Sequence, residues 1–228
     1  MAENIKKVRE RIAGAAGRAG RDASEITLVA VSKTKPVSVI EAAYRAGERV
    51  FGENRVQELS EKFPVLPNDI AWHMIGHLQT NKVKHVLGKA VLIHSLDNIR
   101  LAQTIQEEAQ KRDLLCQVLL EVNVAGEDSK FGLPPQGVEE FVRQIAKFDR
   151  IRVKGLMTVA PFTEKPEENR KYFRQMKRLA VDISGKNIDN VSMEVLSMGM
   201  TGDFEVAVEE GATMVRVGTG IFGERGYH

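Results

Sequence analysis

Strand-like and helix-like segments alternate along almost the whole chain, and this alternation restricts the possible folds more than any other feature. The strand-like segments are short apolar runs rich in β-branched residues, whereas the helix-like segments repeat apolar residues at helical spacing. Strands that alternate with helices form parallel βαβ units. The predicted strands are 26–32, 49–52, 70–75, 91–94, 115–123, 152–158, 191–196 and 213–217, and the predicted helices between them are 37–46, 54–63, 79–88, 98–112, 135–148, 166–182 and 203–210.

Eight such strands, most of them apolar on both faces, predict an α/β fold with one closed (β/α)₈ TIM barrel. An open doubly wound sheet is the alternative. An extra N-terminal amphipathic helix is predicted over 3–19, where Ile5 and Val8 share a face and Gly20 ends the segment. No low-complexity linker or shift in composition divides the chain, so we expect a single domain over 1–228.

Composition excludes several classes of protein. A net charge near +2 gives no basis for strong electrostatic binding to nucleic acid or to a membrane surface. The N-terminal segment lacks the apolar stretch of a secretory signal, and no apolar run approaches membrane-spanning length. The single cysteine, Cys116, lies in a predicted core strand and fits a reducing compartment. We therefore expect a cytoplasmic protein.

Lys33 stands where the first buried strand gives way to a loop, and Pro36 suits the start of the following helix. Barrels of this kind place their chemistry in the loops after the strands. Burial disfavours the charged form of lysine, and a neutral amine attacks carbonyl carbons, as in a Schiff base with pyridoxal phosphate. A surface lysine just past a strand is the alternative. Lys35 would share the face of Lys33 if strand alternation persisted, but it lies farther from the strand end.

The loops after the seventh and eighth strands contain glycines and hydroxyls. Barrels often bind phosphate with these two loops, because exposed N–H groups and hydroxyls form an anion-binding nest. The alternative is ordinary turn chemistry and helix capping. The candidate phosphate-binding residues are Ser197, Gly199 and Thr201 in the first loop and Gly218 and Thr219 in the second.

Arg216 is predicted to point into the barrel mouth, because the valines on either side of it would meet the outer helices. A buried guanidinium needs an acceptor. A cofactor's ring nitrogen is one candidate, and an inward carboxylate such as Glu53, Glu121 or Glu194 is the other. Asp203 suits a helix start, but it would repel a phosphate if it pointed inward.

Six segments in order resemble the pyridoxal phosphate homeostasis protein family. They are VSKTKP (31–36), FGEN (51–54), HMIGHLQTNK (73–82), KFG (130–132), LSMGMT (196–201) and RVGTGIFG (216–223). The resemblance runs nearly end to end, and it implies a fold-type III barrel like the N-terminal domain of bacterial alanine racemase. There are two mild departures. Position 201 is Thr where the family often has Ser, and position 220 is Gly where Ala is usual.

The resemblance also implies roles for individual residues. Lys33 would hold pyridoxal 5′-phosphate as an internal aldimine, with Arg216 facing the pyridine nitrogen and Asn54 near the ring. The residues implied to bind the phosphate are Ser197, Gly218 and Thr219.

An arginine at the ring nitrogen would keep that nitrogen unprotonated, which weakens the cofactor as an electron sink. A racemase also needs a second acid or base, and none of the tyrosines is well placed: Tyr44 and Tyr172 fall in predicted outer helices and Tyr227 in the tail. We therefore expect a monomeric protein that holds pyridoxal phosphate for vitamin B6 homeostasis and cofactor supply, with apo forms of enzymes that use this cofactor as candidate recipients. A weak fold-type III amino-acid racemase is the alternative.

Four histidines raise the alternative of a metal-dependent hydrolase. His73 and His77 lie at a strand and its exit rather than on the helix that an H-E-x-x-H site needs, and position 74 is Met. Together with His85 and His94 they are better explained as isolated histidines, and we expect no metal site.

Overall fold

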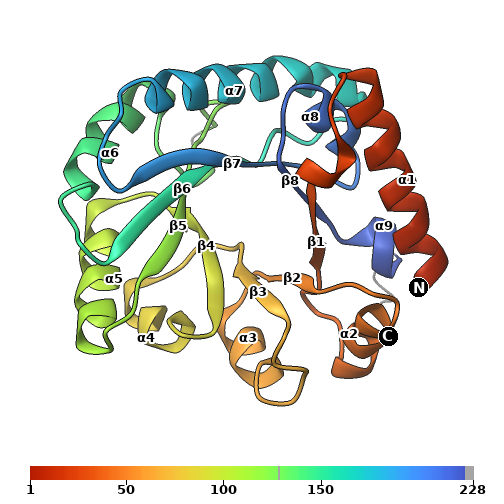
Figure 1. The fold of residues 1–228 in the computed structure, drawn as a ribbon, viewed down its shortest axis with the longest axis horizontal. Coiled ribbons are helices and arrows are strands. Elements are labelled where there is room, and N and C mark those ends of the chain that lie inside the picture. The colour runs from red at the N-terminus through yellow and green to blue at the C-terminus, as the bar shows by residue number, and fades with distance from the viewer. Residues whose placement is uncertain (128, 224–228) are drawn as a thin grey trace.

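The computed structural model describes residues 1–127 and 129–223, and in this part of the chain eight parallel strands close into a barrel (Figure 1). Each strand pairs with the next in sequence, and β8 pairs with β1, with Thr27 beside Met214. This last pairing confirms the closed barrel and excludes the open sheet. The strands are β1 (Thr27–Val31), β2 (Val50–Glu53), β3 (Ala71–Met74), β4 (Ala90–Leu96), β5 (Cys116–Glu121), β6 (Ile151–Met157), β7 (Val191–Met200) and β8 (Met214–Val217).

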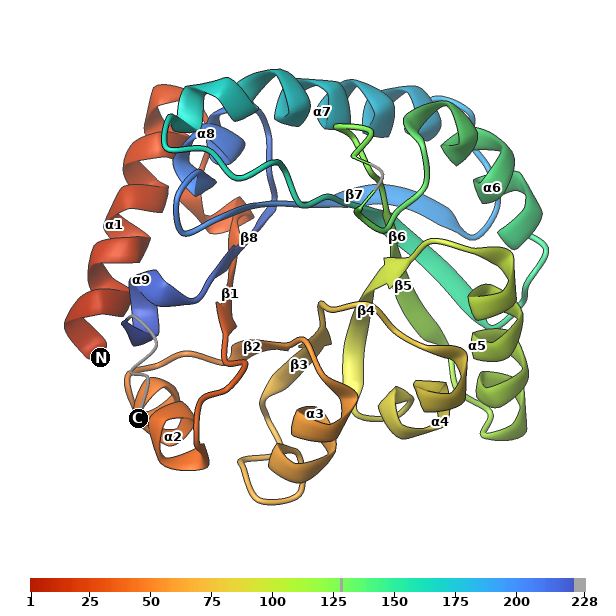
Figure 2. The same ribbon diagram turned by 180° about the vertical axis from the view of Figure 1, so that it is seen from behind.

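Helices surround the barrel on the outside (Figures 1 and 2). The α-helices are α1 (Ala2–Arg18), α2 (Val37–Arg45), α3 (Val56–Lys62), α4 (Val83–Val86), α5 (Ile99–Lys111), α6 (Val138–Ile145), α7 (Arg170–Ser184), α8 (Phe204–Glu209) and α9 (Thr219–Phe222). Short 3₁₀ turns are η1 (Ala23–Glu25), η2 (Thr80–Lys82), η3 (Pro135–Gly137) and η4 (Pro166–Asn169). The predicted N-terminal helix is confirmed, and Gly20 follows it with a φ of 66°, a backbone conformation that favours glycine at a helix end.

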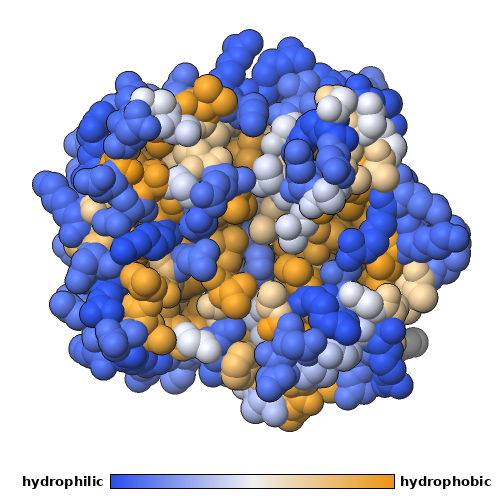
Figure 3. Space-filling view, viewed as in Figure 1, coloured by the Kyte–Doolittle hydropathy of each residue, from blue (hydrophilic) through white to orange (hydrophobic). Residues whose placement is uncertain are grey.

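Strand alternation divides the apolar side chains into two layers. On β8, Val215 and Val217 pack outward with the helices, whereas Met214 and Arg216 point into the barrel, as predicted. Seen from one end, apolar residues gather in the middle of the molecule and hydrophilic residues ring them (Figure 3). The inner layer comprises Val29, Leu92, Leu119, Met157 and Met214.

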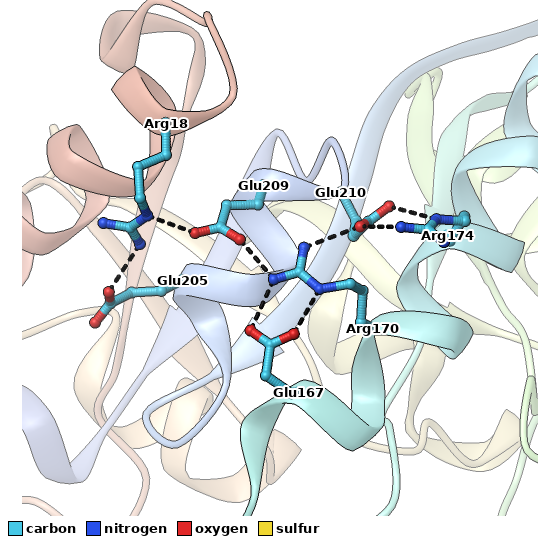
Figure 4. Close-up of polar contacts among 7 residues, drawn as sticks. All are labelled: Arg18, Glu167, Arg170, Arg174, Glu205, Glu209 and Glu210. Carbon is cyan, nitrogen blue, oxygen red and sulfur yellow. Dashed lines mark hydrogen bonds and ion pairs between the residues drawn. The ribbon is translucent and has the colours of Figure 1, made fainter.

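Helix α1 lies along the outside of the barrel next to α8, and an ion-pair network fixes it there (Figure 4). Arg18 donates to Glu209 at 2.7 Å and to Glu205 at 3.1 Å. Glu209 also accepts from Arg170 at 2.6 Å, so the network continues from α1 through α8 to α7. Arg170 further contacts Glu210 at 2.9 Å. Within the described ranges, no helix is long and apolar enough to cross a membrane.

Three details differ from the sequence predictions. The predicted helix over 79–88 is a 3₁₀ turn followed by the single turn α4, and α9 was not predicted. Strand β7 continues to Met200 instead of ending at 196, so Ser197 and Gly199 lie inside a strand rather than in the loop after it.

Cys116 occupies β5 as predicted, and burial raises the pKa of its thiol to about 12.

Candidate functional site

A cavity of about 710 Å³ opens where the strands end, and loops distant in sequence meet around it. Its size falls in the usual range of small-molecule sites. Six of the residues singled out in the sequence line this cavity: Lys33, Asn54, Thr201, Arg216, Gly218 and Thr219. The chain therefore brings the candidate amine, the candidate arginine and parts of both glycine loops to one place.

The backbone on either side of Lys33 is held by a buried cation on α3. Lys62 Nζ donates to the carbonyl oxygen of Ser32 at 3.0 Å, to Glu53 at 2.7 Å and to Glu58 at 2.8 Å. Glu58 in turn accepts from the backbone N–H of Thr34 at 2.7 Å. Both neighbours of Lys33 are thus bonded to one cluster, which fixes the point from which the half-buried Lys33 side chain projects.

Thr34 has a φ of 63°, a conformation that costs a β-branched residue free energy. The hydrogen bond from its N–H to Glu58 holds it there. Strain of this kind is concentrated at functional sites, where surrounding contacts maintain it. The sequence carried no sign of it, because threonine is not a residue that predicts this conformation.

Glu53 is fully buried and lies outside the barrel wall, between the strands and α3. Burial raises the pKa of its carboxyl, while hydrogen bonds from Lys62 and Ser32 oppose that shift. The side chain is thus committed to Lys62, and its other oxygen has no protein partner among the described residues. It is not an acceptor for Arg216.

Arg216 is buried inside the barrel mouth and uses neutral acceptors. It donates to Ser197 Oγ at 2.6 Å and to the carbonyl oxygen of Thr158 at 2.7 Å. Burial lowers the pKa of its guanidinium to about 10. The predicted carboxylate alternative is wrong: Glu194 pairs with Lys154 at 2.7 Å, and Glu121 forms no ion pair with the arginine in the described part of the chain.

Ser197 takes part in a chain of buried polar groups beneath the cavity. Its hydroxyl lies 3.1 Å from His94 Nδ1, and His94 Nε2 lies 2.9 Å from His73 Nδ1. Burial lowers the pKa of His73 to about 4 and that of His94 well below its ordinary value, so both rings are neutral near pH 7. Ser197 does not line the cavity, and its hydroxyl is occupied with Arg216.

Gly199 does not line the cavity either. Its φ is 91°, and a Cβ atom there would stand 2.6 Å from Ala207 Cβ and 2.9 Å from Phe204 Cα. Glycine at this position therefore allows α8 to pack directly against β7. The structure gives this residue a packing role instead of a contact with the cavity.

The two glycine loops meet at Thr201. Thr201 Oγ1 lies 3.5 Å from the backbone nitrogen of Gly220, and Thr201, Gly218 and Thr219 all line the cavity. Asp203, which could have repelled an anion, is occupied elsewhere: it accepts from the Met200 N–H at 2.7 Å and from the Asn169 amide at 2.8 Å. Hydroxyls and backbone without a facing carboxylate suit a phosphate group.

Apolar side chains that the sequence analysis did not single out form the rest of the wall. Phe162, on the loop after β6, is 94% exposed. An apolar side chain in a loop just past a strand end was the signal that could have identified it. The additional apolar and glycine lining residues are Val31, Ile75, Val159, Phe162, Met200 and Gly202.

The histidines do not form a metal centre in the described ranges, where no three His, Cys, Asp or Glu side chains gather in suitable geometry. His73 and His94 are bonded to each other inside the barrel. His77 stacks on Phe131 with 3.9 Å between ring centroids, and His85 lies on α4.

Comparison with known proteins gives the family. The family model described as "Alanine racemase, N-terminal domain" matches residues 1–226. A curated protein of Aquifex aeolicus named "Pyridoxal phosphate homeostasis protein" is 48% identical over 226 residues, which cover 99% of this chain and 98% of that protein. This chain belongs to the pyridoxal phosphate homeostasis protein family. The resemblance seen in the six sequence motifs is confirmed.

Solved structures of relatives have the same fold as this chain. A crystal structure of a protein from Bifidobacterium adolescentis shares 37% identity and a TM-score of 0.92, with 96% of this chain and 93% of that chain covered. PipY of Synechococcus elongatus, solved with pyridoxal phosphate bound, shares 33% identity and a TM-score of 0.82, with 95% of this chain and 100% of that chain covered. The closed barrel of this chain is therefore the fold that these two relatives share.

Proposed function

We propose that this protein binds pyridoxal 5′-phosphate in the 710 Å³ cavity, with Lys33 as its Schiff-base anchor, and that it serves vitamin B6 homeostasis and cofactor supply. The observation that carries the proposal is that Lys33, near the start of the chain, lines one cavity with Arg216 and the Gly218–Thr219 loop near its end. The name of the Aquifex relative and the cofactor in the PipY structure support it.

The residues present fit this cofactor. The Lys33 amine would take the place of the aldehyde oxygen, which would leave as water, and Thr201, Gly218 and Thr219 would hold the phosphate with hydroxyl and backbone N–H groups. Arg216 would donate to the ring nitrogen, and Asn54 would lie beside the ring. When bound, the cofactor supplies an electron-withdrawing ring conjugated to the amine.

We assign Ser197 a different role from the phosphate binding that the sequence suggested. Its hydroxyl accepts from Arg216 at 2.6 Å, so it would set the direction of the guanidinium instead of touching the phosphate. His94 Nδ1 on the other side of the hydroxyl completes its hydrogen bonding. Gly199 would contribute only the packing of α8 on β7.

A cofactor-holding role is favoured over racemisation by the positions of the tyrosines. Tyr44 lies on α2 and bonds to Asp69 at 2.8 Å, and Tyr172 lies on α7. Neither lines the cavity, and Tyr227 lies outside the described residues. A racemase needs a second acid or base on the far face of the substrate, and the described lining offers no tyrosine for it.

The test compares Lys33→Ala with Lys35→Ala. Wild type and Lys35→Ala should purify with the visible absorbance of a Schiff base, and Lys33→Ala should lack it while keeping its far-ultraviolet circular dichroism spectrum. Lys35 is the matched control, because it is half-buried on the same loop and its Nζ lies 3.4 Å from the Phe222 carbonyl oxygen. Retention of the absorbance by Lys33→Ala would refute the anchor.

Recipients and oligomeric state belong to the same proposal. Loaded protein mixed with an apo enzyme that needs pyridoxal phosphate should restore that enzyme's activity faster than the same concentration of free cofactor released from a chemical buffer. Proton exchange at the α-carbon of amino acids should stay at background. Size-exclusion chromatography with light scattering should give a monomer of about 25.4 kDa. The single buried cysteine is consistent with a cytoplasmic site of action.

A further inference from the structure

A second cavity of about 520 Å³ adjoins the first and shares Asn54 as a wall. It lies between α3 and the η2–α4 segment, and side chains from the 73–82 motif line it although that motif contributes only Ile75 to the cofactor cavity. Its cationic lining residues are Arg55 and Lys82, with the imidazoles of His77 and His85 beside them.

The lining is cationic and otherwise neutral. None of the described residues that line this cavity is acidic, and the remaining ones are amides, the Ser60 hydroxyl and one valine. Lys89 adds a further cation at the edge, since its Nζ donates to Ser60 Oγ at 3.1 Å. Convergent cations and neutral donors without a carboxylate are the chemistry that binds phosphate.

Three carboxylates stand near the rim, and each already has a partner. Glu61 accepts from Gln57 at 2.9 Å, and Glu58 accepts from Lys62 and the Thr34 N–H. Asp97 accepts from the Asn98 amide at 2.7 Å and lies 4.0 Å from His77 Nδ1. Neither Arg55 nor Lys82 forms an ion pair with another described residue, although Arg55 is close enough to Glu58 to help lower the pKa of that carboxyl.

The wall between the two cavities is held in place. A Cβ atom on Gly76 would stand 2.8 Å from Asn54 Cα and closer still to the Asn54 carbonyl oxygen, so only glycine permits this contact. His77, the next residue, is oriented by its stack on Phe131. Asn54 therefore has a fixed position between two sites of different character.

We propose that this second cavity binds a small phosphate monoester, with Arg55 and Lys82 holding its phosphate group. Two permanent cations match a dianion, and the volume leaves room for an organic part beyond the phosphate itself. The site is separate from the one assigned to pyridoxal phosphate. Its occupant would contact Asn54 from the side opposite the cofactor.

The test uses loaded wild-type protein, so that the cofactor's own phosphate site is filled, and glycerol 3-phosphate, inorganic phosphate and succinate as probes. Amide chemical shifts are followed by NMR while the visible absorbance reports retention of the cofactor. Glycerol 3-phosphate should bind saturably with shifts confined to residues 54–60 and 77–85, and succinate should bind about tenfold more weakly or worse.

Arg55→Gln and Lys82→Met should each weaken glycerol 3-phosphate binding about tenfold or more, because each removes a charge-assisted contact. Both side chains are exposed, so these variants should fold, and thermal melts verify this. Lys84→Met is the matched control: Lys84 is an exposed lysine on α4 that does not line the cavity, and its loss should leave binding unchanged.

Several results would overturn the proposal. They are an absence of saturable shifts, equal binding of succinate, an equal loss in Lys84→Met, or shifts at Gly218 and Thr219. The last result would mean that the probe enters the cofactor site. If the protein purified without pyridoxal phosphate, the proposed function would fail. The residues whose amide shifts change on addition of glycerol 3-phosphate would still show whether the second cavity binds it.

Discussion

At the scale of single residues, Lys62 is the group on which the geometry around Lys33 most depends. It is buried, and it bonds to the Ser32 carbonyl oxygen and to two carboxylates, one of which, Glu53, is fully buried. Removing one partner of a buried ion pair leaves an uncompensated charge, which costs far more than losing an exposed pair.

We expect Lys62→Met to lower the free energy of unfolding by about 3–5 kcal/mol. Urea denaturation monitored by circular dichroism measures the change. Lys111→Met is the control, because Lys111 is 65% exposed and pairs with Glu108 at the surface, so its loss should change the free energy of unfolding far less. Similar losses in the two variants would show that the Lys62 cluster does not behave as a buried one.

Titration of the Glu121 carboxyl should change the free energy of unfolding. Burial first, and then Asp97, raise the pKa of its carboxyl to about 7, while Arg216 opposes the shift. One of its oxygens is buried with no protein partner in the described part of the chain. The folded protein therefore binds this proton more tightly than the unfolded chain, and the contribution of Glu121 to stability falls as pH rises from about 4.5 to about 7.

We expect Glu121→Gln to be more stable than the wild type by about 2 kcal/mol near pH 8 and to match it near pH 4. Urea denaturation of both proteins across this range measures the difference. The buried histidines titrate in the opposite sense, but they are common to both proteins and cancel. Glu107→Gln, the same change at an exposed glutamate on α5, serves as the control. A difference that does not depend on pH would contradict the account.

At the scale of elements, the network in Figure 4 ties together helices from the two ends of the chain. Arg170 on α7 bonds to Glu209 and Glu210 of the α8 segment, whose side chains are only 19% and 13% exposed. Because Arg18 of α1 shares Glu209, the N-terminal helix depends on the same carboxylate. A partly buried network of this kind contributes more than isolated surface pairs.

We expect Arg170→Met to lower the free energy of unfolding by about 1–3 kcal/mol, and added salt to narrow its difference from the wild type. Arg143→Met is the matched control, since Arg143 pairs with Glu139 within α6. Both of these side chains are about half exposed, so the loss of stability should be much smaller. Equal costs would contradict a network role.

The elements themselves were largely predictable, because apolar runs and helical spacing follow directly from burial. All eight strands lie within a few residues of their predicted ranges. Strand β7 is the exception that matters for the site. Its register shifts between Ser197 and Met200, and Gly199 has a φ of 91°, so the strand continues where glycines and hydroxyls indicated a loop. The position of Ser197 depends on that irregularity, which no sequence period encodes.

At the scale of the whole molecule, closure of the barrel is what creates the site. The β1–β8 pairing brings Lys33, near the start of the chain, beside Gly218 and Thr219, near its end. The sequence could indicate which loops carry polar groups, because loops after parallel strands gather at one end of a barrel. It could not indicate the Lys62 cluster or the second cavity, since these arise from side chains on α3 and α4 that meet only in the folded structure.

The most direct test of the central claim is to locate the covalent bond to the cofactor. The purified protein is reduced with borohydride, digested, and its peptides are mapped by mass spectrometry. We predict one phosphopyridoxyl group, on Lys33 alone, with fragment ions that separate Lys33 from Lys35. An adduct on Lys35 or elsewhere, or none on protein saturated with pyridoxal phosphate, would contradict the account.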